Sequence, residues 1–152
     1  MREALRPIVI AGLVVGVLDI ASAFIIAVSR GSTPMRLLQY IASGLLGRPA
    51  FNGGVSTAAL GLALHFVIAF GVVIVFFLAS RKLVVLRERP VLCGVAYGVI
   101  VFAVMNLIVL PLSGATIRHA LVPDLIQLAI HMFIVGLPTS LLIRRFSGAR
   151  GL

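Results

Sequence analysis

Long runs of apolar residues alternate with short polar connections along this 152-residue chain. A helix that crosses the hydrocarbon core of a bilayer needs about 20 predominantly apolar residues, because each residue adds about 1.5 Å. Four runs meet this requirement, at residues 8–29, 58–79, 91–112 and 125–143. We therefore predict an all-α polytopic membrane protein in which residues 1–152 form a single transmembrane domain of four spans.

The connection between the first two runs is long for a helical bundle and carries a helical pattern of its own. Thr33 can cap a helix that begins at Pro34, and Gly47 with Pro49 beyond it can end that helix. Apolar and polar residues are interleaved between these positions. The pattern predicts a short interfacial helix over about 34–46, lying on the membrane or capping the bundle.

Composition excludes a typical soluble domain. The chain is 61% hydrophobic and 11% charged, whereas soluble domains average about 45–50% apolar and about 25% charged residues. A net charge of +9 can indicate a nucleic-acid partner, but the basic residues lie between and beyond the apolar runs. We therefore expect no nucleic-acid partner. The single cysteine, Cys93, cannot form an intramolecular disulfide and fits no metal-site spacing.

The basic residues are divided unequally between the two sides of a four-span bundle. Nine lie on the side of the termini and the central loop, and four lie on the other side. Because cytoplasmic loops carry an excess of Lys and Arg, we predict that both termini are cytoplasmic. The nine are Arg2, Arg6, Arg81, Lys82, Arg87, Arg89, Arg144, Arg145 and Arg150, and the four are Arg30, Arg36, Arg48 and Arg118.

A short motif occurs in both the second and the fourth span. Residues 62–68 read LALHFVI and residues 128–134 read LAIHMFI, which gives His65 and His131 matching positions. The first and third spans each carry a GxxxG pair, a spacing that lets helix backbones approach closely in lipid. We therefore predict two pseudo-symmetric hairpins related by an axis along the membrane normal. The helix-packing glycines are Gly12, Gly16, Gly94 and Gly98.

Each predicted span carries a strongly polar residue in the half that lies away from the termini. Asp19 is ten residues from the end of its run, roughly 15 Å deep, and the other three are six or seven residues in, roughly 10 Å. Asn106 lies off the stripe formed by Gly94 and Gly98. Because ionisable residues in membrane helices almost always face the bundle interior, we predict a buried polar cluster. Its members are Asp19, His65, Asn106, Gln127 and His131.

The function that we predict is a non-catalytic scaffold or accessory subunit of a larger membrane complex. In this interpretation the cluster only fixes the helix register, with Asp19 accepting hydrogen bonds from His65 or His131 and Asn106 bridging. The expected partners are the lipid bilayer and other membrane subunits or a second copy of the chain. We predict no enzyme activity, since the sequence holds no phosphate loop, nucleophile elbow or paired carboxylates.

Two alternatives stay open. His65 and His131 can face each other across a bundle diagonal of about 13 Å and act as axial ligands of a b-type haem. However, a porphyrin between the helices needs space at the level of its axial ligands. Gly16 and Gly98, the glycines that could provide this space, lie nearer the termini than the histidines. The second alternative is a small proton-coupled conduit or transporter, because Asp19 beside histidines can exchange protons near neutral pH.

Three stretches carry a resemblance to known proteins: GVAYG at 94–98, MNLIVLPLS at 105–113 and LALHF at 62–66. With these the chain resembles, over nearly its whole length, a group of small bacterial four-span membrane proteins of unknown function. The resemblance implies a bacterial inner-membrane location and the four-span fold. It implies no activity and no functional residue.

Overall fold

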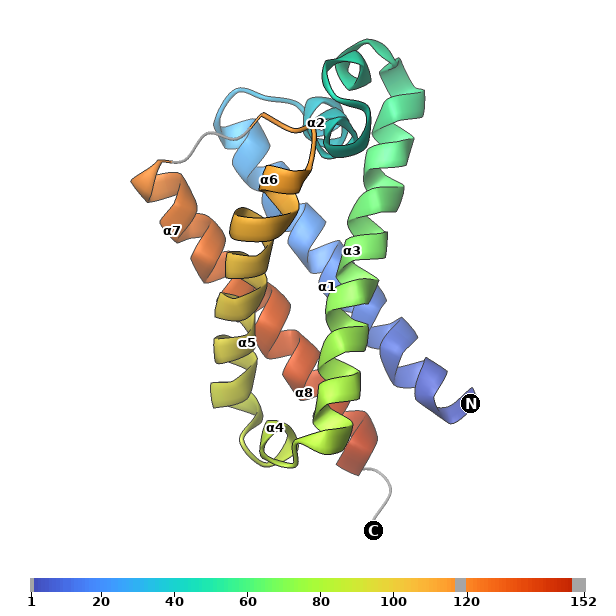
Figure 1. Ribbon diagram of the computed structural model, residues 1–152, viewed down its shortest axis with the longest axis vertical. Coiled ribbons are helices and arrows are strands. Elements are labelled where there is room, and N and C mark those ends of the chain that lie inside the picture. Colours follow the sequence, from blue (N-terminus) through green and yellow to red (C-terminus); the bar gives the residue numbers. More distant parts are fainter. Residues whose placement is uncertain (1, 117–119, 149–152) are drawn as a thin grey trace.

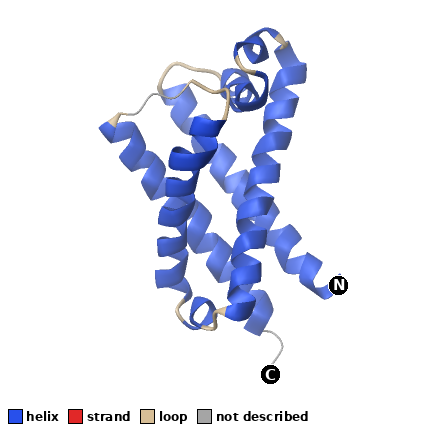
Figure 2. Ribbon diagram, viewed as in Figure 1, coloured by secondary structure: helices blue, strands red, loops and turns tan. Residues whose placement is uncertain are grey.

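The computed structural model describes residues 2–116 and 120–148, which form helices and connecting loops without a strand in those ranges (Figure 2). Four helical rods are long and apolar enough to cross a membrane: Leu5–Ser29, Gly54–Lys82, Pro90–Leu112 and Leu121–Phe146. The all-α fold with four membrane-spanning helices, predicted from the apolar runs, is confirmed.

The rods and their connections have the following bounds. The rods are α1 (Arg2–Ser29); α3 (Gly54–Lys82); α5 (Pro90–Val104), continued by the π-helical η2 (Met105–Val109) and by α6 (Leu110–Leu112); and α7 (Leu121–Ile130), continued by the π-helical η3 (His131–Gly136) and by α8 (Leu137–Gly148). The connections contain α2 (Pro34–Leu46), the 3-10 helix η1 (Arg48–Asn52) and α4 (Val85–Glu88). The rods extend past the predicted runs because flanking polar residues continue them, as Arg81 and Lys82 do in the last turn of α3.

Helix α2 has the bounds that its capping residues predict. The Arg36 backbone N–H donates to the Thr33 hydroxyl at 3.2 Å, and Gly47 ends the helix with a φ of +64°. Gly61 of α3 lies so close to α2 that a Cβ there would overlap the Leu38 carbonyl group. Helix α2 therefore packs tightly on α3 and covers one end of the bundle (Figure 1).

The four rods pack together into one bundle (Figure 1). Helix α1 packs against α3 on one side and against η3 and α8 on the other, and α5 packs against η3 and α8. The Tyr97 hydroxyl joins the third span to the second by donating to the Val72 carbonyl at 2.7 Å. The second span also contacts the fourth directly, through α3 and α8.

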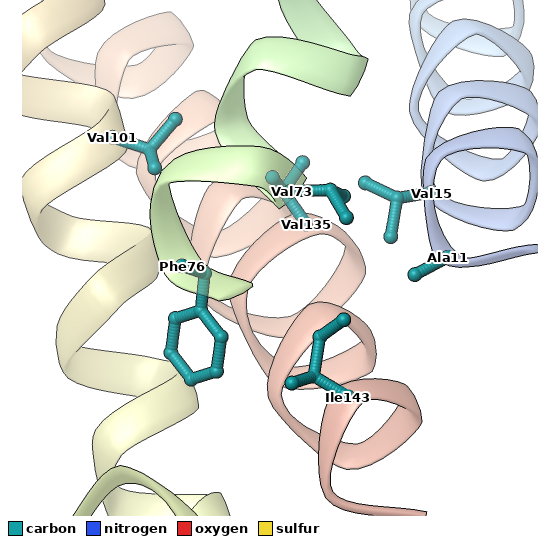
Figure 3. Close-up of a cluster of buried hydrophobic side chains, with 7 residues drawn as sticks. All are labelled: Ala11, Val15, Val73, Phe76, Val101, Val135 and Ile143. Carbon is teal, nitrogen blue, oxygen red and sulfur yellow. The ribbon is translucent and has the colours of Figure 1, made fainter. Parts of the chain in front are cut away.

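An apolar core fills the half of the bundle nearer the termini. It takes residues from all four spans, and Val15, Val73 and Phe76 are at most 1% exposed. Large apolar side chains such as Val67 and Ile100 point outward, as a helix surrounded by lipid requires. Figure 3 shows the core residues Ala11, Val15, Val73, Phe76, Val101, Val135 and Ile143.

Candidate functional site

A cavity of about 810 Å³ occupies the other half of the bundle, under α2. It forms because α1 packs against η3 and α8 of the fourth span but has no comparable packing against the described residues of α7. The cavity reaches from Asp19 to the exposed side chains of Arg30 and Arg36. All five residues of the predicted polar cluster line it: Asp19, His65, Asn106, Gln127 and His131.

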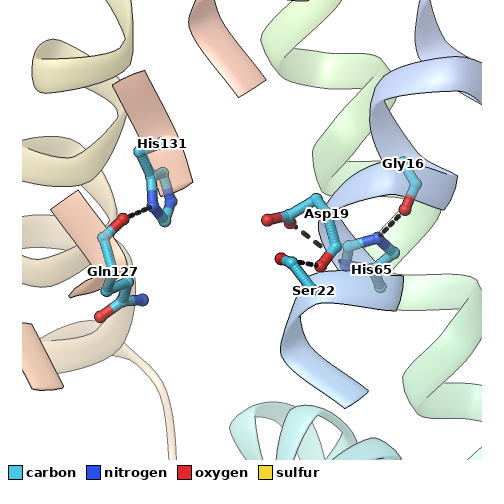
Figure 4. A network of polar contacts seen from close by, with 6 residues as sticks. All are labelled: Gly16, Asp19, Ser22, His65, Gln127 and His131. Atoms are coloured by element: carbon cyan, nitrogen blue, oxygen red, sulfur yellow. Dashed lines mark hydrogen bonds and ion pairs between the residues drawn. The ribbon is translucent and has the colours of Figure 1, made fainter. Parts of the chain in front are cut away.

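His65 links α3 to α1 through both of its ring nitrogens (Figure 4). Its Nε2 lies 2.9 Å from the Gly16 carbonyl oxygen. A carbonyl only accepts, so Nε2 carries a proton and donates it. The other nitrogen, Nδ1, lies 4.0 Å from Asp19 Oδ2, which is within ion-pair distance but too long for a direct hydrogen bond. Nδ1 is therefore the nitrogen at which His65 can exchange a proton with Asp19.

His131 has the opposite arrangement of its ring nitrogens. Its Nδ1 lies 2.8 Å from the backbone carbonyl of Gln127, one turn earlier, and must donate to it. In the neutral ring Nε2 is then the acceptor. Figure 4 shows His131 and the Asp19 carboxylate on opposite sides of one opening, and the two groups interact electrostatically. The Asp19 carboxylate, whose side chain is 28% exposed, thus lies between two imidazoles of defined tautomer.

Asn106 does not bridge Asp19 and the histidines through any hydrogen bond found in the described ranges. Its Nδ2 donates to the Phe102 carbonyl at 2.9 Å, within its own helix. Asn106 is nevertheless buried, because it faces the cavity while the glycine stripe of α5 faces the fourth span. The bridging role of Asn106 stays a prediction, and the residue lines the same cavity as the rest of the cluster.

The predicted glycines lie where the two helices of each hairpin meet. Gly12 and Gly16 face the rings of Phe70 and Phe66, whereas a Cβ at Gly98 would overlap the His131 carbonyl. Gly94 packs against the backbone of Leu137 in α8. The glycine pair of the first helix therefore touches the histidine-bearing helix in both hairpins.

Sequence reasoning missed the residues at the mouth of the cavity. Arg30, Arg36 and Tyr40 line it, and the Tyr40 hydroxyl donates to the Thr116 carbonyl at 3.2 Å. Burial raises the pKa of the Tyr40 phenol above its ordinary value. In the sequence these arginines are signals of topology alone, since their convergence depends on how α2 folds back over the bundle.

The geometry of His65 does not fit an axial haem ligand. His65 uses Nε2 for Gly16 and directs Nδ1 at Asp19, so ligation through either nitrogen breaks an existing contact. Among residues 2–116 and 120–148, no group of three or more His, Cys, Asp or Glu side chains is placed to hold a metal ion. We therefore derive no chemistry through haem or a metal for this arrangement.

Comparison of the chain with family models, with curated proteins and with solved structures finds no match in any of the three. A function for this protein is therefore inferred from the chemistry of the residues that line the cavity.

Proposed function

We propose that this protein is a small proton-coupled transporter that binds a solute in an outward-facing cavity and couples this binding to protonation of Asp19. The observation that carries the proposal is the position of the Asp19 carboxylate between His65 and His131 in a cavity that reaches the surface at one end. Ionisable residues inside membrane helices typically mark ion or proton pathways.

The proton balance follows from the two tautomers. A proton on the Asp19 carboxyl group can move to Nδ1 of His65, which leaves a carboxylate and an imidazolium whose Nε2–H still donates to Gly16. His131 can accept the same proton at Nε2 in place of His65. A cationic or hydrogen-bond-donating solute stabilises the carboxylate, so its binding favours transfer of the proton to a histidine.

The apolar core supports a transporter over an open channel. It lies between the cavity and the α4 end of the bundle and consists of closely packed side chains such as Val15, Val73 and Val135 (Figure 3). A proton or solute bound at Asp19 therefore has access to one side only, which corresponds to one state of an alternating-access cycle.

The orientation of the protein in the membrane is part of this proposal. Both termini are cytoplasmic, the α2 end faces outward, and the membrane is the inner membrane of a bacterium. The nine-to-four division of basic residues supports this orientation, although Arg118 and Arg150 lie outside the described residues. The duplicated hairpin is supported by the level at which the glycines meet the partner helix: Gly16 faces Phe66, next to His65, and Gly98 faces His131.

Infrared titration of the purified protein tests the proton-binding step. The chain has only four acidic side chains, Glu3, Asp19, Glu88 and Asp124, so the carboxyl band of each can be assigned by single substitutions. Asp19→Asn should remove one pH-dependent carboxyl band, and His65→Gln should shift it because the imidazole neighbour is lost. Asp124→Asn, which changes another carboxylate of the same cavity, should leave that band in place.

Proton uptake into proteoliposomes tests the transport step. Uptake should fall about tenfold or more in Asp19→Asn and should persist in Asp124→Asn, because general acid–base groups contribute at least that much to a proton transfer. Equal uptake by the wild type and Asp19→Asn would rule out transport through Asp19.

The function as a non-catalytic scaffold or accessory subunit of a larger membrane complex stays a prediction. Purification in mild detergent tests it, since an accessory subunit should co-purify with stoichiometric partners. A single monodisperse species would contradict it.

A further inference from the structure

A second pocket, of about 640 Å³, lies beside the cavity mouth where α2 and η1 meet the loop after α6. It is lined by Arg36, Tyr40, Arg48, Phe51 and Thr116, three of which also line the cavity. Two guanidinium groups therefore converge on one concave surface. Neither forms an ion pair with a carboxylate within residues 2–116 and 120–148, where the ion pair found is the one between His65 and Asp19.

The pocket holds the Arg36 guanidinium in place without neutralising it. This group lies 4.9 Å from the centroid of the Phe51 ring, in a cation–π contact. The Tyr40 hydroxyl donates to the Thr116 carbonyl and ties the pocket wall to the loop after α6. Because burial raises the pKa of Tyr40, its phenol stays neutral and does not repel an anion. The result is a positively charged pocket with an ordered contact at Arg36.

The chemistry of this pocket fits a phosphate group. Guanidinium groups bind phosphate through paired, charge-assisted hydrogen bonds, and two of them match its negative oxygens. Helix α2 lies across the ends of the spans, which is the level of the lipid headgroups. It also exposes Met35, Leu45 and Leu46, at 44%, 68% and 42%, as an apolar surface for acyl chains.

We propose that Arg36 and Arg48 bind the phosphate of an anionic phospholipid from the leaflet at the α2 end, while its acyl chains remain in the bilayer. This site does not depend on proton coupling at Asp19.

Native mass spectrometry of the protein in mixed micelles tests the site, with phosphatidylglycerol and phosphatidylcholine as probes. The wild type should retain phosphatidylglycerol preferentially. The double variant Arg36→Gln/Arg48→Gln should bind it about tenfold more weakly or worse, since hydrogen bonds to charged groups are worth about 1.5–3 kcal/mol. The matched control Arg81→Gln/Arg89→Gln, with the same charge change at the other end, should bind like the wild type.

Two further measurements distinguish loss of the lipid site from misfolding of the double variant. Phe51→Leu leaves both charges but removes the ring under Arg36, and it should weaken phosphatidylglycerol binding less than the double variant does. For the wild type, inorganic phosphate should not displace the lipid at equal concentration. Displacement by inorganic phosphate, equal binding of both lipids, or equal loss in the Arg81/Arg89 control would each overturn the proposal.

Discussion

At the scale of single residues, the glycines of this bundle differ in what they touch. Gly12 and Gly16 face aromatic rings, which can rotate away from a new methyl group. Gly98 and Gly136 face the backbone of the opposite helix, which can move only if the whole helix moves. The GxxxG pairs Gly12/Gly16 and Gly94/Gly98 look alike in the sequence. The contact between α5 and η3, which includes Gly98, nevertheless tolerates less added volume than the contact between α1 and α3.

Gly98→Ala should lower the free energy of unfolding by about 1–3 kcal/mol, the usual cost of overpacking, because its Cβ would overlap the His131 carbonyl. Gly71→Ala is the control. A Cβ there meets nothing within 4 Å, so the better helix propensity of Ala should raise stability by up to about 1 kcal/mol. Thermal unfolding in detergent measures both changes, and equal effects would contradict the close contact at Gly98.

At the scale of helices, the third and fourth spans share a local defect beside the cavity. Each contains a π-helical turn, in which the Leu110 N–H donates to Met105 and the Leu137 N–H to Met132, five residues back. Each turn is followed closely by a proline, Pro111 or Pro138. A proline lacks an N–H and its ring clashes with the carbonyl four residues earlier, so a wider turn relieves the clash.

Pro138→Ala should restore a backbone donor and allow η3 to become regular α-helix. Hydrogen exchange of the amides at 131–137 should then slow, because the widened turn is lost. Pro123→Ala is the control on the same helix, since a first-turn proline costs no hydrogen bond. Mass spectrometry of deuterium uptake in nanodiscs measures the difference. An unchanged rate at 131–137 in Pro138→Ala would show that the proline does not cause the π-turn.

The same elements show what the sequence could predict. The ends of α2 follow from Thr33, Pro34 and Gly47, because capping is local chemistry. Pro138 inside the fourth span is also a local signal, since a proline disrupts an interior helical turn. The π-helical form does not follow from the sequence, because a proline can be accommodated either by a kink or by a wider turn. Local signals therefore predicted where the helices lie but not their irregular turns.

At the scale of the whole molecule, polar and apolar interiors are separated along the bundle axis. The cavity with Asp19 fills the α2 half, and the apolar core fills the α4 half. The depth of the polar residues in the four spans predicted which of them share a level. The cavity was not predictable, because it arises from the separation of α1 and α7, and this depends on packing over the length of both helices.

Thiol labelling of intact cells tests the predicted orientation. In a Cys93→Ser background, Ser22→Cys lies on the cavity wall and should react with a membrane-impermeant maleimide. Val84→Cys is the control, since Val84 is 52% exposed at the start of α4 and should stay unlabelled if the α4 end is cytoplasmic. Labelling of Val84→Cys alone would indicate the inverted orientation.

The one-sided cavity also has an electrical consequence. Asp19 lies ten residues from the end of α1, roughly 15 Å along a helix and about half of a 30 Å hydrocarbon core. A proton that reaches Asp19 from the α2 side has then moved about halfway through the membrane, along the cavity. Since a unit charge gains about 2.3 kcal/mol per 100 mV across the full membrane, half of that path is worth at most about 1 kcal/mol. Membrane voltage, and not only pH, would therefore set how often this carboxylate is protonated.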